Sequence, residues 1–202
     1  RAWVEVDCGA LRHNLRALNG AMEEGQRMMA VVKAEGYGHG AVPLARLLEG
    51  EGVDAFATAT LDEAVELRRA GIRGTILILG YVPPEAVPVA LRRKLTLTVV
   101  DEAHAAALEA TGKPVHVHWK VDTGMHRLGV DWERLTKTVR ACPHLVTDGV
   151  YTHLCVSDQL DEKSRAFTVL QLERFRQALE TLEQAGIRSK EVHAQASYGL
   201  LN

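Results

Sequence analysis

The stretch VHVHWKVD, residues 115–122, alternates apolar and polar side chains from its first residue to its last. Successive side chains of a β-strand point to opposite faces, so one face of this strand is entirely apolar. The other face carries His116, His118, Lys120 and Asp122. Two interpretations are open. Either the strand is an edge with its polar face in water, or its apolar face packs under helices and its polar face lines an interior.

The rest of the chain repeats short β-branched runs separated by apolar residues at helical spacing. Further strands are predicted at 29–33, 54–59, 75–80, 95–100, 149–154 and 191–196. Helices are predicted around 11–22, 42–48, 61–67, 103–110, 132–139 and 162–185. The longest helix has an apolar stripe of Phe167, Leu170, Leu172, Phe175, Leu179 and Leu182. Strands that alternate with helices predict an α/β protein with parallel pairing and both sheet faces covered.

Eight such units close a (β/α)8 TIM-type barrel of about 250 residues. This chain has 202 residues and offers about seven units, so the predicted barrel is incomplete and lacks its eighth strand. A doubly wound open sheet is the alternative, but no dinucleotide-type glycine pattern follows the first strand. The segment WVEVD, residues 3–7, is also strand-like and has no place inside a barrel.

In a barrel, functional groups lie at the carboxyl ends of the strands and in the loops that follow them. The predicted strand ends are Lys33, Thr58, Gly80, Lys120 with Asp122, His153 and Ser197. Arg127 follows a tight turn that Gly124 permits. The alternation also places Tyr151, His153 and Cys155 on one face of their strand, and His193 and Gln195 on one face of the last strand. A lysine buried on such an inner face must be paired, neutral or modified.

Several chemistries fit these residues. A desolvated lysine can form a Schiff base with a carbonyl compound, including pyridoxal phosphate (PLP). A lysine near Arg127 can be carbamylated, which turns a cation into an anion that pairs with the arginine. A divalent metal could instead bind His116, His118, a carbamylated Lys120, His153 and His193. A nucleophilic pair of Cys155 and His153 is the weakest option, because a lone cysteine in a strand is usually a small core residue.

The overall composition excludes several classes of protein. The net charge is -2 and no dense basic run is present, so neither nucleic acid nor a membrane surface is the expected partner. The three cysteines are widely spaced, which indicates a reducing compartment, the cytoplasm, rather than a disulfide framework or a zinc site. The first residue is Arg1, so we expect the chain to come from something longer, and the cytosolic domain of a membrane-anchored protein is one candidate.

Two long motifs give the chain a family resemblance. AVVKAEGYGHG (30–40) resembles the lysine signature of the alanine racemases, and KVDTGMHRLG (120–129) resembles their second signature, in the same order. AWVEVD, ALRHNLRAL, YTHLCVSD and HAQASYGLLN extend the resemblance over essentially the whole chain. The forms GMHRLG, THLCVSD and SYGLLN are most similar to the racemase domain of the membrane-bound serine/alanine racemases of vancomycin-resistance systems.

The resemblance implies a PLP-dependent isomerase, with no metal, that interconverts L- and D-alanine or L- and D-serine for peptidoglycan precursors. Lys33 would hold PLP and serve as one of two catalytic bases, and Tyr37 and Ser197 would lie by the phosphate. Arg127 would contact the phenolic oxygen of PLP, steadied by a carbamylated Lys120. His153 would lie beneath an arginine that faces the pyridine nitrogen. One position departs from the family, which usually has Asn where this chain has Ala196.

The resemblance also implies parts that these residues lack. Family members have an eighth strand and a C-terminal β domain whose tyrosine is the opposite-face base, supplied across a homodimer interface. Residues 1–8 would pair with that β domain, and residues 9–202 would form the truncated PLP barrel. The alternative for function is a single-domain PLP-binding barrel that carries the cofactor without turnover.

Overall fold

The computed structural model describes residues 3–194, and the chain divides into two compact units. Unit 1 comprises residues 1–82 and 88–96, and unit 2 comprises residues 83–87 and 97–202. Residues 3–7, predicted as a strand, have no regular secondary structure, and their pairing with a further domain stays a prediction. No helix in the described part of the chain is long and apolar enough to span a bilayer.

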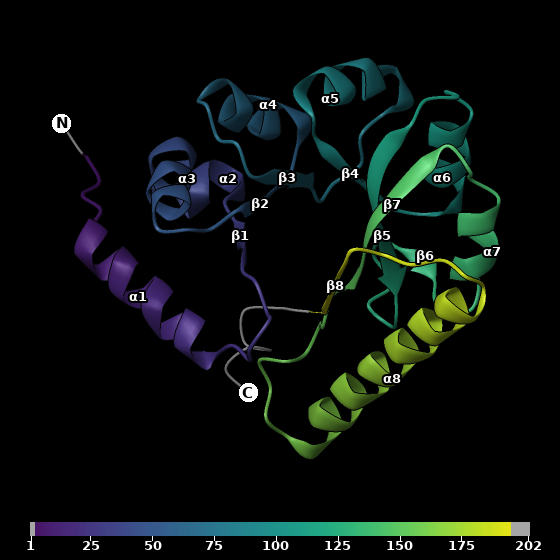
Figure 1. Ribbon diagram of the computed structural model, residues 1–202. Helices are drawn as coiled ribbons and strands as arrows, with labels where there is room; N and C mark the ends of the chain where they lie inside the picture. Colours follow the sequence, from purple (N-terminus) through teal and green to yellow (C-terminus); the bar gives the residue numbers. More distant parts are fainter. Residues whose placement is uncertain (1–2, 195–202) are drawn as a thin grey trace. The chain divides into compact units, whose positions relative to one another are not determined.

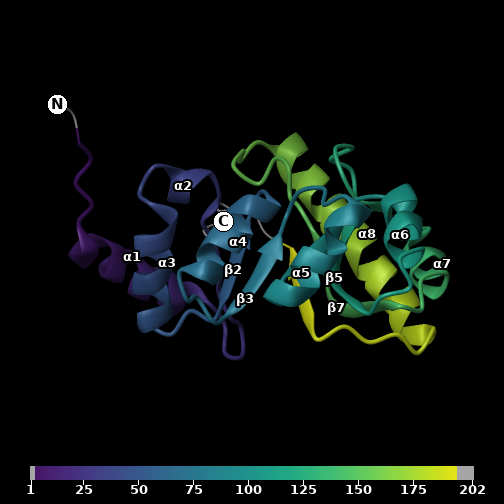
Figure 2. The same ribbon diagram turned by 90° about the horizontal axis from the view of Figure 1, so that it is seen from above.

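Unit 1 contains three parallel strands, each followed by a helix or turn (Figure 1). Its strands are β1 (Met29–Val31), β2 (Ala55–Thr58) and β3 (Thr75–Ile78). Its helices are α1 (Cys8–Ala21), α2 (Lys33–Tyr37), α3 (Ala41–Gly50), α4 (Leu61–Arg69) and most of α5 (Val87–Arg93). Helix α4 packs on β2 and β3 (Figure 2). The core of this unit includes Phe56, Leu67 and Ile76, which are completely buried.

Unit 2 also has parallel strands, in the order β4-β5-β7-β8. These are β4 (Thr96–Val99), β5 (Val115–Asp122), β7 (Leu145–Thr152) and β8 (Glu191–Ala194), and the short β6 (Val130–Asp131) pairs with β5. The other elements are the 3-10 turn η1 (Pro84–Ala86) and the helices α6 (Glu102–Glu109), α7 (Leu135–Arg140) and α8 (Glu162–Gln184). Helix α7 packs against α8 (Figure 1).

Strand β7 contains an irregularity that matters for the inner face. Val117 is opposite Thr147, but His118 is opposite Gly149, so Asp148 is an extra residue on β7. A Cβ on Gly149 would lie 2.6 Å from the His118 ring, so only glycine leaves room for that ring. The strand was predicted to begin at residue 149; it begins at Leu145, and the bulge at Asp148 separates its first three residues from the predicted run.

Four elements were not predicted, and the stripe of the longest helix was partly wrong. None of α2, η1, α5 and β6 was predicted. In α8 the buried residues are Gln171, Phe175, Ala178 and Leu182, whereas Leu170 and Leu172 are more than two-fifths exposed. The helix therefore presents a different face to the core from the one its leucines indicate, and that face includes a glutamine.

One arginine of unit 1 joins the turn before β3 to the end of α5. The guanidinium of Arg68 on α4 donates to the carbonyls of Ile72, Gly74, Arg93 and Lys94 at 2.6–3.1 Å. These carbonyls belong to the turn before β3 and to the end of α5. Burial lowers the pKa of Arg68, partly opposed by Glu49. One side chain thus satisfies four carbonyls that no lysine ammonium could reach together.

We predict that Arg68→Lys lowers the free energy of unfolding by about 2–4 kcal/mol, since several half-buried carbonyls lose their donor. Urea denaturation followed by circular dichroism measures this loss. Arg69→Lys, at the exposed neighbouring position, is the control and should change stability by less than about 0.5 kcal/mol. Equal effects at the two positions would contradict the assignment.

Candidate functional site

Lys33 lies where β1 gives way to a strained turn in unit 1. The next four residues, Ala34 to Tyr37, all have left-handed backbone conformations with φ of 51–59°. Only one of them, Gly36, is a glycine. A left-handed conformation costs about 1–2 kcal/mol at each non-glycine residue, so α2 is one turn of left-handed helix kept against its own preference. Strain of this kind is found at functional sites, where the surrounding structure maintains it.

Several contacts maintain the turn. The amide of Gly36 donates to the carbonyl of Val32 at 3.0 Å, and the amides of Gly38 and Gly40 donate to the carbonyl of Glu35 at 3.0 and 2.9 Å. A Cβ on Gly36 would lie 3.2–3.3 Å from Leu44 and Ala41, so the turn packs tightly against α3. Lys33 is half-buried, whereas Tyr37 is 60% exposed.

Four polar side chains gather on one face of the strands of unit 2. The Nδ1 of His118 lies 3.0 Å from the Nε2 of His193, and the ring of Tyr151 stacks on that of His193 at 4.6 Å between centroids. Lys120 Nζ lies 6.0 Å from the centre of the Tyr151 ring. His118 and Lys120 are only 1% and 5% exposed, so the interpretation of residues 115–122 as a solvated edge strand is wrong. Of the four polar residues predicted to share one face of β5, His118 and Lys120 both lie against the stacked Tyr151 and His193 rings, whereas His116 is exposed.

Burial determines the charge of these groups. It lowers the pKa of His118 to about 4, a shift that the Asp148 carboxylate partly opposes. It lowers the pKa of His193 to about 3, with His118 adding to the effect. The pKa of Tyr151 rises to about 12 through burial, opposed by its hydrogen bond with Thr98 and by the charge of Arg127. Both histidines and the tyrosine are therefore neutral near pH 7.

Asp148, the extra residue of β7, has a carboxylate that is paired with two basic side chains. Its carboxylate contacts His116 Nδ1 at 2.6 Å and accepts from Lys190 at 2.7 Å. Burial raises the pKa of Asp148, but the hydrogen bonds from Lys190 and His116 outweigh it, and the pKa is lowered overall. The bulged residue of β7 is thus held on the protein surface by two basic side chains.

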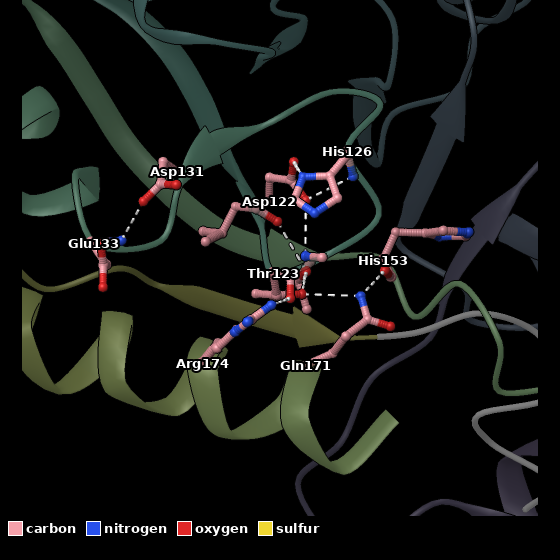
Figure 3. Close-up of polar contacts among 11 residues, drawn as sticks. Asp122, Thr123, His126, Asp131, Glu133, His153, Gln171 and Arg174 are labelled. Atoms are coloured by element: carbon pink, nitrogen blue, oxygen red, sulfur yellow. Dashed lines mark hydrogen bonds and ion pairs between the residues drawn. The ribbon is translucent and has the colours of Figure 1, made fainter. Parts of the chain in front are cut away.

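The loop that carries Arg127 is shaped by Asp122, the last residue of β5. The carboxylate of Asp122 accepts from the amides of Gly124 and His126, both at 3.0 Å (Figure 3). The loop then returns to β5, because β6 pairs with the last two residues of that strand. Arg127 itself is exposed, and its charge acts on Tyr151.

Helix α8 ties this loop to the one that follows β7. Gln171 is completely buried, and its amide group donates to Thr123 Oγ1 and to the carbonyl of His153, both at 3.1 Å (Figure 3). Its oxygen accepts from the amide of Cys155 at 3.1 Å, and Arg174 donates to the carbonyl of Thr123 at 2.9 Å. The backbone of His153 and the start of the Arg127 loop are therefore held by one helix.

The predicted residues can now be placed. Lys33 and Tyr37 lie on the left-handed turn of unit 1, and Thr58 and Gly80 lie at and beyond the ends of β2 and β3. In unit 2, Lys120 lies inside β5, Arg127 in the loop after it and His153 directly after β7. Ser197, Ala196 and Gln195 lie outside the described residues. Sequence reasoning missed Gln171, whose only signal is its position four residues before the buried Phe175.

Two of the alternative chemistries find no support. The thiol of Cys155 donates to the Gln171 oxygen at 3.4 Å, a structural contact that does not suit a Cys155–His153 nucleophile pair. Within residues 3–194, no three His, Cys, Asp or Glu side chains are grouped as a metal would require. His118 and His193, two of the predicted metal ligands, bond each other through Nδ1 of His118 and Nε2 of His193.

The buried histidine pair predicts acid sensitivity. The pKa values of both histidines are lowered in the folded state, so below about pH 6.5 the unfolded chain binds more protons than the folded one. Stability is therefore present above that pH and lost as the pH falls toward 4, by up to roughly 1.4 kcal/mol per pH unit for each histidine. Urea midpoints between about pH 7 and 4.5 measure the slope. His193→Gln should flatten it, whereas His13→Gln, at an exposed position, should leave it unchanged.

The comparisons with known proteins agree with the sequence motifs. Residues 6–202 match the family described as "Alanine racemase, N-terminal domain". The chain is 42% identical to an alanine racemase of Symbiobacterium thermophilum, covering 98% of this chain and 54% of that protein. It is 39% identical to a serine/alanine racemase of Enterococcus gallinarum, covering 100% of this chain and 29% of that protein. The chain thus spans about half or less of the length of these relatives.

A solved structure supports the fold class. The alanine racemase of Bacillus anthracis with bound L-Ala-P gives a TM-score of 0.89 at 33% identity, over 99% of this chain and 53% of that one. The predicted fold class, an incomplete TIM-type α/β barrel, is confirmed. With matching motifs, parallel βα units and a family match that begins at residue 6 and runs to residue 202, the chain belongs to the alanine racemase family, of which it represents the N-terminal domain.

Proposed function

We propose that this chain is the PLP-binding domain of an amino-acid racemase that acts in the cytoplasm on alanine or serine. The observation that carries the proposal is Lys33, a half-buried primary amine at the head of a strained turn, inside the lysine signature of the family. Membership of the family supports racemase activity. The choice between the two amino acids, a role in peptidoglycan synthesis and any link to vancomycin resistance remain part of the proposal.

The residues present fit the cofactor chemically. PLP, when bound, withdraws electrons from the Cα–H bond of an amino acid and makes its proton removable. Lys33 offers the amine for covalent attachment, and the exposed Tyr37 offers a hydroxyl donor near the same turn. Arg127 offers a planar cation suited to an anionic oxygen. Ser197, the expected second phosphate ligand, stays a prediction.

Four residues of this chain then have defined roles in the proposed reaction. Lys33 takes a proton from one face of the substrate Cα and returns it there. Arg127 would hold the phenolic oxygen of the cofactor, and a carbamate on the buried Lys120 would neutralise and steady that guanidinium. Burial of Lys120, at 5% exposure, favours a modification that an exposed lysine would not retain. His153, fixed through its backbone by Gln171, supports the pyridine side of the site.

Racemisation needs a second base on the opposite face. We propose that this base is a tyrosine supplied by a C-terminal domain of the other subunit of a homodimer. The relatives support this, because the chain covers only 54% of the alanine racemase of Symbiobacterium thermophilum. The 202-residue chain would then hold one base of the two.

The first test is the site of attachment. Incubation with PLP, borohydride reduction and peptide mapping should place the pyridoxyl group on Lys33, because it is the half-buried amine of the turn. Lys33→Ala should abolish labelling, whereas Lys137→Ala, at an exposed position of α7, should retain it. A label on another lysine, or none, would overturn the proposal.

The second test concerns the missing base. In D₂O with L-alanine and PLP, the chain alone should exchange the Cα proton faster than it inverts the amino acid, since Lys33 serves one face only. Mass spectrometry measures the exchange and chiral chromatography measures the inversion, with Lys33→Ala as the control. Inversion as fast as exchange would show that both bases lie within these residues and would refute the division of labour.

A further inference from the structure

The carboxylate of Glu63 joins two strand ends of unit 1. Glu63 lies in the first turn of α4 and is half-buried. Its Oε2 accepts from the amides of Ala59 and Thr60 at 2.7 and 3.2 Å, just after β2. Its Oε1 accepts from the amide of Ala34 at 2.8 Å, just after β1. One side chain therefore holds the backbone segments that follow two adjacent strands.

Part of this arrangement is ordinary helix capping. Thr60 and Glu63 form a capping box, in which the Thr60 hydroxyl accepts from the Glu63 amide and the Glu63 carboxylate accepts from the Thr60 amide. A capping box requires nothing from Ala34, which lies 29 residues away in the chain. The contact with Ala34 thus needs a reason outside α4.

The Ala34 amide occupies a special position. It belongs to the peptide that leaves Lys33, and it opens the left-handed turn. The first amides of a helical turn have no acceptor within the turn, and a carboxylate is a stronger acceptor than a neutral group. Holding this amide fixes the plane of the peptide between residues 33 and 34, and with it the direction in which the Lys33 side chain leaves the backbone.

We propose that Glu63 is a positioning residue for Lys33. Its carboxylate keeps the strained turn closed and aims the lysine amine at its reaction partner. The inference rests on the proposed function for the reaction that Lys33 performs, but the contact with Ala34 can be tested without the cofactor.

The structure offers a matched pair of variants. Glu63→Ala removes both the capping contact and the Ala34 contact, whereas Thr60→Ala weakens the same capping box and leaves the Ala34 contact in place. Glu63→Gln keeps the shape and one acceptor oxygen and should give intermediate effects. Circular dichroism and urea midpoints select conditions in which all four proteins are folded.

The first readout is hydrogen exchange at the Ala34 amide, measured by NMR. Glu63→Ala should exchange at least roughly tenfold faster than the parent, as expected for the loss of a charged hydrogen bond. Thr60→Ala should match the parent at this amide. Equal exchange in Glu63→Ala and Thr60→Ala would overturn the proposal.

The second readout is the behaviour of Lys33 itself. In Glu63→Ala, acetylation of Lys33 by acetic anhydride, normalised to the exposed Lys137, should become faster because the turn opens. Capture by PLP, trapped with borohydride, should become slower because the amine is no longer aimed. Thr60→Ala should change neither rate. If Glu63→Ala leaves both rates unchanged, Glu63 has only a structural role.

The two hypotheses fail in different ways. If the parent chain is not captured by PLP at Lys33, the proposed function fails, while Ala34 exchange and Lys33 acetylation still decide the role of Glu63. If the parent is captured and Glu63→Ala is captured equally fast, the positioning role fails and the proposed function stands.

Discussion

A parallel strand covered on both faces gives its polar side chains no access to water, so each of them must find a partner inside the protein. In unit 2 this constraint accounts for most of the polar architecture. His118 bonds His193, Tyr151 stacks on His193 and bonds Thr98, and Lys120 lies over the Tyr151 ring. Within residues 3–194, no buried side-chain nitrogen or oxygen lacks a hydrogen-bond partner. The inner face is thus a connected set in which moving one group leaves another unsatisfied.

In both units, the backbone just after a strand that carries a candidate catalytic residue is held by a side chain from a later helix. The candidate catalytic residues Lys33 and His153 lie two residues after β1 and one residue after β7, where the backbone leaves the ladder and loses its regular partners. In both units a polar side chain from a later helix replaces those partners. Glu63 of α4 accepts from the residue after Lys33, and Gln171 of α8 donates to the carbonyl of His153. Neither Glu63 nor Gln171 is itself among the family-motif residues assigned to chemistry, yet both hold the backbone that carries those residues.

Much of the fold could be predicted from the sequence, because β-branched runs and helical spacing are local signals. A strand is present at each of the seven positions predicted for the barrel, although residues 3–7 form none, and the long helix was placed within a residue at each end. Strand β6 was missed because two residues are too short to show a period. Helix α5 was missed because Pro88 looks like a breaker, although proline is tolerated in a first turn.

The site was less predictable, because its decisive contacts are distant in the chain or lack a sequence signal. Gln171 meets Thr123 from 48 residues away, and only its spacing of four residues from Phe175 marks that glutamine as buried. The segment after Lys33 resembles a glycine loop, but three of its four left-handed residues are Ala, Glu and Tyr, so no glycine pattern indicates the turn. The identities of the candidate residues came from the motifs, and the interactions that hold them came only from the structure.

The bulge on β7 restricts which substitutions evolution can accept at two positions of this protein. Position 149 has no side chain because the His118 ring fills the space where a Cβ would lie. Neither position is free to vary by itself: a larger residue at 149 is acceptable only if 118 becomes smaller, and a smaller residue at 118 leaves a hole beside His193. Substitutions at these two positions, 31 residues apart, are therefore coupled. Replacing both residues one at a time passes through at least one poorly packed intermediate.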